Sequence, residues 1–113
     1  MKLRMAFRGM EHSNAMEEYA NKKMEKLERF LQREPEPLYV DLVLEAARQH
    51  HHHKVELRIN SKHHHIMVHS EGPDLYQQID LVMDKAVHEA KKDKERMLDE
   101  RNHPKNNLKD TFS

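Results

Sequence analysis

The sequence predicts an α+β fold in which two helices cover one face of a four-stranded sheet. Short stretches place apolar residues at every second position, as strands with one buried face do. Two longer stretches place apolar residues three and four positions apart, as amphipathic helices do. The elements follow in the order β-α-β-β-β-α, and a two-layer sandwich is the arrangement that buries the apolar face of each.

The chain begins with a strand and a long helix. Residues 3–7 alternate apolar and basic or small side chains, and Gly9 ends this strand. Ser13 is a suitable N-cap for a helix that we expect to continue to about Arg33. The apolar stripe of this helix consists of Met16, Ala20, Met24, Leu27 and Leu31.

Three more strands follow, separated by polar turns. Pro35 and Pro37 cannot continue the helix. After them, period-two patterns predict strands over residues 39–46, 54–59 and 66–70. The turns between these strands are short, so we expect an antiparallel meander.

A second long helix completes the domain. Gly72 and Pro73 set the turn before it, and Asp74 caps its start or favours its positive end. Its apolar face consists of Leu75, Ile79, Val82, Met83, Ala86, Val87 and Ala90. Beyond residue 91 we expect it to project past the core. Residues 1–101 are therefore predicted to form one domain, and residues 102–113 a flexible tail.

Composition excludes several classes of protein. There are 20 basic (Lys+Arg) and 20 acidic (Asp+Glu) residues, so any attraction to RNA must come from how charge is distributed. The absence of cysteine excludes disulfides, thiolate ligands and a thiol nucleophile. No apolar stretch is long enough to span a membrane, and we expect a cytoplasmic protein. Without a glycine-rich loop or a nucleophile-base pattern, we expect neither an enzyme nor a cofactor.

Basic residues form a stripe along each helix, because their spacing superposes them on one face. The stripe of the first helix, at spacings of four, three and four, consists of Lys22, Lys26, Arg29 and Arg33. The stripe of the second, at spacings of three, four and four, consists of Lys85, His88, Lys92 and Arg96. Such stripes can contact the phosphates of folded RNA. An ordinary solvated face with ion pairs such as Glu18 with Lys22 and Glu25 with Arg29 explains the same spacing, and the sequence alone leaves both readings open.

Residues 71–80, EGPDLYQQID, resemble a motif of the bacterial ribosome hibernation promoting factor and ribosome-associated inhibitor family. Lys23-x-x-Lys26-Leu27-Glu28, Lys85 and the order of elements support this resemblance, which covers about residues 1–98. It implies a fold similar in outline to double-stranded-RNA-binding domains. It also implies that the chain binds the small ribosomal subunit and its rRNA near the decoding centre, blocks mRNA and tRNA, and silences whole ribosomes in stress or stationary phase. Neither DNA nor a membrane is an implied partner.

The resemblance adds expectations about particular residues. Basic residues that face ribosomal RNA in the family match Lys23, Lys26, Lys85, Lys91 and Lys92. Tyr76 could stack on a base, but we expect its ring to pack against the sheet. We expect a short form of the family, without the C-terminal domain of its long members. Short forms either act with a small ribosome-pairing factor or oppose pairing, and the sequence leaves both open.

Histidine runs at 50–53 and 63–65 suggest an alternative, because clustered imidazoles bind zinc, nickel or copper. A strand of six residues between them, at ~3.3 Å per residue, would separate the runs by roughly 20 Å, too far to share one metal ion. We therefore expect no dedicated metal site, and loop histidines that gain charge below neutral pH and strengthen RNA binding. A histidine-based metal-binding protein and a regulatory protein-interaction domain are the alternative functions.

Overall fold

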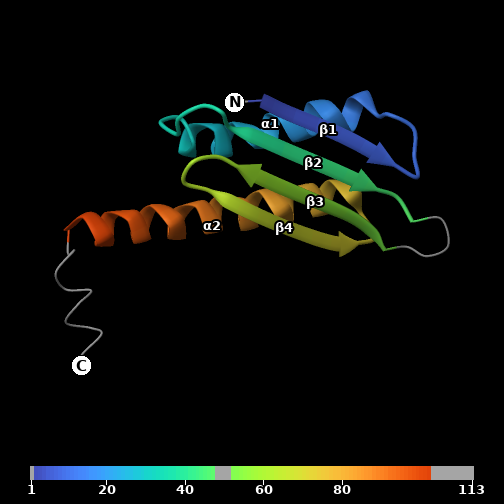
Figure 1. The fold of residues 1–113 in the computed structure, drawn as a ribbon. Helices are drawn as coiled ribbons and strands as arrows, with labels where there is room; N and C mark the ends of the chain where they lie inside the picture. The colour runs from blue at the N-terminus through green and yellow to red at the C-terminus, as the bar shows by residue number, and fades with distance from the viewer. Residues whose placement is uncertain (1, 48–51, 103–113) are drawn as a thin grey trace.

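The computed structural model describes residues 2–47 and 52–102 of the chain. It contains six elements in the predicted order: β1 (Lys2–Arg8), α1 (Asn14–Phe30), β2 (Tyr39–Glu45), β3 (His53–Asn60), β4 (His65–Gly72) and α2 (Leu75–Asn102). The strands form one sheet in the order β1-β2-β3-β4 (Figure 1). The predicted α+β class and its four-stranded sheet are confirmed.

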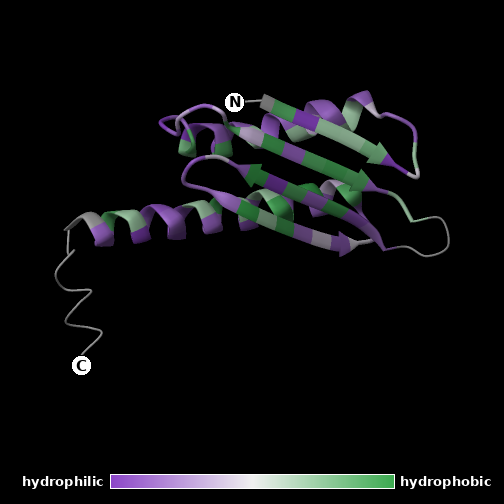
Figure 2. Ribbon diagram, viewed as in Figure 1, coloured by the Kyte–Doolittle hydropathy of each residue, from purple (hydrophilic) through white to green (hydrophobic). Residues whose placement is uncertain are grey.

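The sheet is mixed, because its first pair differs from the other two. β1 runs parallel to β2, while β2, β3 and β4 form the expected antiparallel meander. Leu42 stands opposite both Met5 of β1 and Leu57 of β3, so the apolar positions of neighbouring strands share one face. Figure 2 shows the resulting alternation of hydrophobic and hydrophilic residues along the strands.

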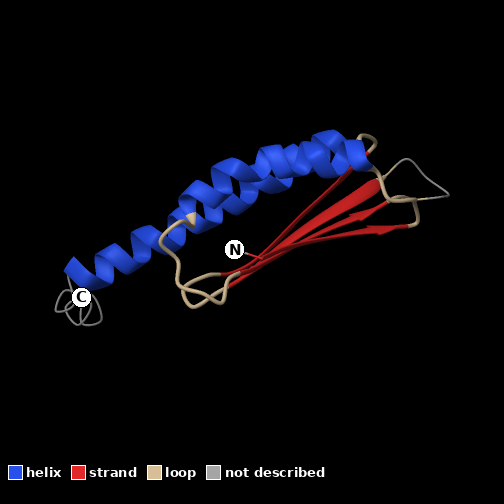
Figure 3. Cartoon of the chain, turned by 90° about the horizontal axis from the view of Figure 1, so that it is seen from above, coloured by secondary structure: helices blue, strands red, loops and turns tan. Residues whose placement is uncertain are grey.

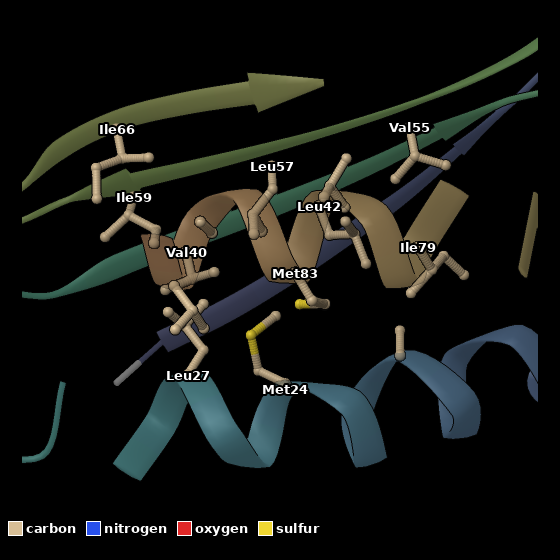
Figure 4. Close-up of a cluster of buried hydrophobic side chains, with 14 of the residues drawn as sticks. Met24, Leu27, Val40, Leu42, Val55, Leu57, Ile59, Ile66, Ile79 and Met83 are labelled. Carbon is tan, nitrogen blue, oxygen red and sulfur yellow. The ribbon is translucent and has the colours of Figure 1, made fainter. Parts of the chain in front are cut away.

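Both helices lie on the same face of the sheet, as Figure 3 shows from above. Figure 4 shows the core between the two layers, where Met24 and Leu27 of α1 and Ile79 and Met83 of α2 point toward apolar strand residues. Most side chains of this cluster are fully buried. Burying such a side chain contributes about 1.5–3 kcal/mol, so hydrophobic contact between the layers is the main force that fixes the helices.

Gly9 ends β1 for a reason that the structure makes specific. Its φ is 68°, in the left-handed region, and a Cβ atom there would lie 2.6 Å from the carbonyl oxygen of Ala46. Any other residue would be strained on both counts. This close approach lets the backbone N–H of Ala46 donate to the carbonyl oxygen of Arg8.

Several element boundaries differ slightly from the prediction, and β1, β3 and β4 are each longer than predicted. α1 ends at Phe30, and Arg33 lies in the turn that follows, because Pro35 disfavours helical geometry at the residue before it. β2 ends one residue before Ala46. α2 runs to Asn102, one residue into the predicted tail, and its last turns extend past the sheet as expected (Figure 1). Residues 103–113 of that tail lie outside the described residues.

In the part of the chain that the structure describes, no helix could span a membrane. Neither α1 nor α2 combines the length and the apolar character that crossing a bilayer requires.

Candidate nucleic-acid interface

The basic residues of the first helix form a continuous exposed surface, the α1 stripe, consisting of Lys22, Lys26, Arg29 and Arg33. Within residues 2–47 and 52–102, no carboxylate forms an ion pair with any of them. The pairs expected of an ordinary solvated face, Glu18 with Lys22 and Glu25 with Arg29, are therefore not formed. These cations are available to an external anion.

A groove between the two helices runs beside this stripe. Its α1 wall consists of Lys22, Lys23, Glu25, Lys26 and Arg29, and its α2 wall of Asp80, Met83, Asp84 and Val87. Three carboxylates thus line the groove beside the cations, and none of them forms an ion pair with the α1 stripe. The groove separates a basic wall on α1 from an acidic and apolar wall on α2, so an anion would be drawn to its α1 side.

Asp80 links the two helices at one end of this groove. Its carboxylate oxygens accept hydrogen bonds from the Tyr19 hydroxyl at 2.8 and 2.9 Å, and Lys23 Nζ lies 3.6 Å away. The hydrogen bond to Asp80, followed by burial and the Asp80 charge, raises the pKa of Tyr19. Lys23 also lies over the Tyr19 ring, 5.4 Å from its centroid. Lys23 is therefore held in place, unlike the residues of the α1 stripe.

Tyr76 has a different packing partner from the one predicted. Its ring meets the Tyr19 ring edge to face, with centroids 5.0 Å apart. It thus packs on α1, where the sequence analysis expected the sheet, because this position of α2 faces the neighbouring helix. The predicted cap of α2 is confirmed, since Asp74 Oδ1 accepts the backbone N–H of Tyr76 at 3.0 Å.

The basic residues predicted on the second helix are all exposed, but most already have partners. Lys85 Nζ donates to the carbonyl oxygen of His69 in β4 at 2.7 Å. Lys92 and Arg96 pair with acidic residues three positions earlier, Glu89 at 3.4 Å and Asp93 at 2.8 Å. The contact with β4 places Lys85 on the side of α2 away from α1. His88 and Lys91 complete the predicted set, without an ion pair among the described residues.

The structure therefore does not bring the two basic stripes around a common groove. The α1 stripe and Lys23 border the groove between the helices, while Lys85 lies beside β4. The sequence showed that both sets would be exposed, but it did not show which cations are paired within the protein.

The histidines of the β3–β4 turn serve as structural contacts. His64 is 1% exposed, and its Nδ1 lies 2.8 Å from Asp93 Oδ2 of α2. Its neighbours are exposed, with His63 bonded to Glu34 and His65 to Asn60. Tertiary packing therefore buries His64 away from any external RNA phosphate.

The two histidine runs lie at opposite ends of β3, as expected. His53 begins that strand and accepts the backbone N–H of Ala47 on Nδ1 at 3.1 Å. Positions 50 and 51 lie outside the described residues. In the described part of the chain, no three His, Cys, Asp or Glu side chains gather in a way that could hold a metal ion.

Glu34 connects the end of α1 to the β3–β4 turn. Its carboxylate accepts hydrogen bonds from the Ser61 hydroxyl at 2.5 Å, the His63 backbone N–H at 2.7 Å and the His63 ring at 2.9 Å. Burial alone would raise the pKa of Glu34, but these hydrogen bonds outweigh it and lower the pKa to about 2. No local pattern in the sequence indicates this contact, because its partners are far apart in the chain.

Comparison with known proteins identifies the family. Residues 3–98 match the family model described as sigma 54 modulation protein / S30EA ribosomal protein. The chain belongs to this family. The family predicted from the motif at residues 71–80 is thereby confirmed.

Solved structures support the S30EA fold. The Protein Y N-terminal domain of Thermus thermophilus is 26% identical with a TM-score of 0.70, over 81% of this chain and 98% of that one. A ribosomal subunit interface protein from Coxiella burnetii has a TM-score of 0.66 and 21% identity, over 83% of this chain and 98% of that one. No curated protein sequence matches the chain.

Proposed function

We propose that this S30EA-family chain is a non-enzymatic factor that inactivates translation. It binds the small ribosomal subunit near the decoding centre and occupies the channel that mRNA and tRNA use, and it acts during stress or stationary phase in the cytoplasm. Membership of a family described as a ribosomal protein supports this proposal, as does similarity to a protein named for the ribosomal subunit interface.

The observation that carries the proposal is the unpaired α1 stripe. Its four cations are exposed and make no ion pair with the described carboxylates, although the chain has a net charge of zero. Within α1, from position 22 to position 29, the stripe extends about 10 Å, at ~1.5 Å per residue, and Arg33 follows in the turn after the helix. Each ammonium or guanidinium that meets an RNA phosphate releases counterions, and no intramolecular pair must first be broken.

The decisive experiment compares two charge-reversal variants in sedimentation with purified small ribosomal subunits. The test variant carries Lys26→Glu and Arg29→Glu in the α1 stripe. The matched control carries Arg8→Glu and Lys54→Glu, the same residue types on the sheet face away from the helices. We expect the wild type and the control to sediment with the subunit. The test variant should lose at least about tenfold in affinity, because two phosphate contacts become repulsive.

A second measurement tests the blocking step. Wild-type protein should reduce the binding of mRNA and initiator tRNA to small subunits, and the test variant should not. If the wild type binds the subunit while mRNA and tRNA bind unchanged, the chain occupies another site and the proposed mechanism is wrong. If the control loses binding as strongly as the test variant, the α1 stripe is not the contact surface.

A further inference from the structure

A second groove lies where α1 ends, against the β3–β4 turn and the distal part of α2. Its apolar lining comes from Phe30, Met97 and Leu98, and its polar lining includes Arg33, His63 and Lys94. The Leu98 side chain is 51% exposed, which is high for a large apolar residue near other apolar residues. The groove has a volume of about 340 Å³. This volume is near the lower end of the ~300–1,000 Å³ range of ligand pockets. A groove of this size suits one small planar group better than a protein helix.

Internal hydrogen bonds hold the walls of this groove in place. Lys94 Nζ donates to the carbonyl oxygen of Phe30 at 2.5 Å and lies 4.1 Å from the centroid of its ring. The Glu34 carboxylate is fixed by Ser61 and His63, so its charge is already compensated within the protein. Lys94 and Glu34 of the walls thus have partners within the protein, while Leu98 of the apolar lining remains exposed to solvent.

The positive charge of Arg33 and its position indicate which kind of ligand the groove binds. Arg33 belongs both to the α1 stripe and to the lining of this groove, and it makes no ion pair within the described residues. An RNA strand that follows the α1 stripe therefore reaches the groove with its phosphates beside a guanidinium. A planar base next to that phosphate would find the apolar side chains of Met97 and Leu98 and the aromatic residue Phe30.

We propose that this groove binds one unpaired base of RNA, with Met97 and Leu98 in contact with the base and Arg33 in contact with an adjacent phosphate. This inference rests on the proposed function, since it assumes that RNA lies along the α1 stripe. It adds a preference for RNA with single-stranded nucleotides next to a duplex.

The test uses Leu98→Ser and the matched control Leu81→Ser. Leu81 is also an exposed leucine of α2, 40% exposed, and does not line the groove. Binding is measured to a blunt RNA duplex and to the same duplex with a single-stranded extension that contains 2-aminopurine. Leu98→Ser should weaken binding of the extended RNA about fivefold or more and leave binding of the blunt duplex unchanged, because serine removes apolar surface that the base would bury. Leu81→Ser should bind both RNAs like the wild type.

Photocrosslinking identifies the class of occupant on the ribosome itself. A benzophenone amino acid at position 98 should crosslink to rRNA in the complex with small subunits, and the same group at position 81 should not. Crosslinking of position 98 to a ribosomal protein, or no crosslink there, would overturn the base-binding groove. If the wild type binds subunits and Leu98→Ser discriminates the two RNAs as the wild type does, only the groove proposal fails. If the wild type binds neither subunits nor RNA, the proposed function fails with it.

Discussion

Glu34 is the residue whose ionisation most directly links structure to stability. Its hydrogen bonds to Ser61 and His63 favour the charged carboxylate and lower its pKa from the ordinary value of 4.5 to about 2. The charged form is therefore stabilised by folding. This stabilisation is fully present above about pH 4.5 and is lost as the pH falls through about 2.

The substitution Glu34→Gln removes the carboxylate, so the free energy of unfolding of the variant should differ from that of the wild type by an amount that depends on pH. At neutral pH the variant should have a lower free energy of unfolding, and the difference should shrink on acidification to about pH 2. The change is at most on the order of 3 kcal/mol, at ~1.4 kcal/mol per unit of pKa. Urea denaturation at a series of pH values measures it, with the exposed Glu28→Gln as a control that should follow the wild type. A constant difference between Glu34→Gln and the wild type at every pH would contradict the assignment.

At the scale of elements, the junction between β4 and α2 depends on a small residue. Gly72 is buried, and a Cβ atom there would lie 2.3 Å from Gln78 Nε2. The Gln78 side chain is 3% exposed and accepts a hydrogen bond from the Ser70 hydroxyl at 2.5 Å. The glycine therefore makes room for a buried amide that joins the last strand to the last helix.

A double-mutant cycle tests this junction. Gly72→Ala should displace the Gln78 amide and lower the free energy of unfolding by about 1–3 kcal/mol, the usual effect of leaving a buried polar group unpaired. In a Gln78→Ala background the same substitution should have much less effect, because the obstructing amide is gone. Chemical denaturation of the four proteins of the cycle gives the coupling energy. Additive effects would show that Gly72 is needed for another reason.

The elements also show which parts of this structure can be predicted from sequence. Strands and helices were found because the periods of two and 3.6 are local properties of the chain. The α1 stripe was found for the same reason, since its spacing alone makes it exposed. The partners of Tyr19, Glu34 and His64 were not found, because contacts between elements depend on how the helices and the sheet align in space. Spacing allows the i,i+3 pairs of the α2 cations as well as the i,i+4 pairs on α1 that are not formed, so spacing alone does not decide which cations are paired.

At the scale of the whole molecule, zero net charge makes the location of unpaired cations decisive for RNA binding. The α1 stripe has no ion pairs among the described residues, whereas Lys92 and Arg96 of α2 pair with Glu89 and Asp93. A cation that is already paired gives a smaller net gain when it meets a phosphate, because its partner must be released. Basic residues on the two helices should therefore differ in their effect on salt dependence.

Two double variants with the same residue types separate these contributions. Lys26→Gln with Arg29→Gln removes two unpaired cations of α1, and Lys92→Gln with Arg96→Gln removes two paired cations of α2. The slope of log affinity against log salt concentration, measured for small ribosomal subunits, should fall in magnitude by about 1.5–2 for the α1 variant. The α2 variant should change it clearly less, because Lys92 and Arg96 are already paired with Glu89 and Asp93 within the protein. Equal changes in slope would mean that the ion pairs on α2 open on binding, and that both helices contact RNA to the same extent.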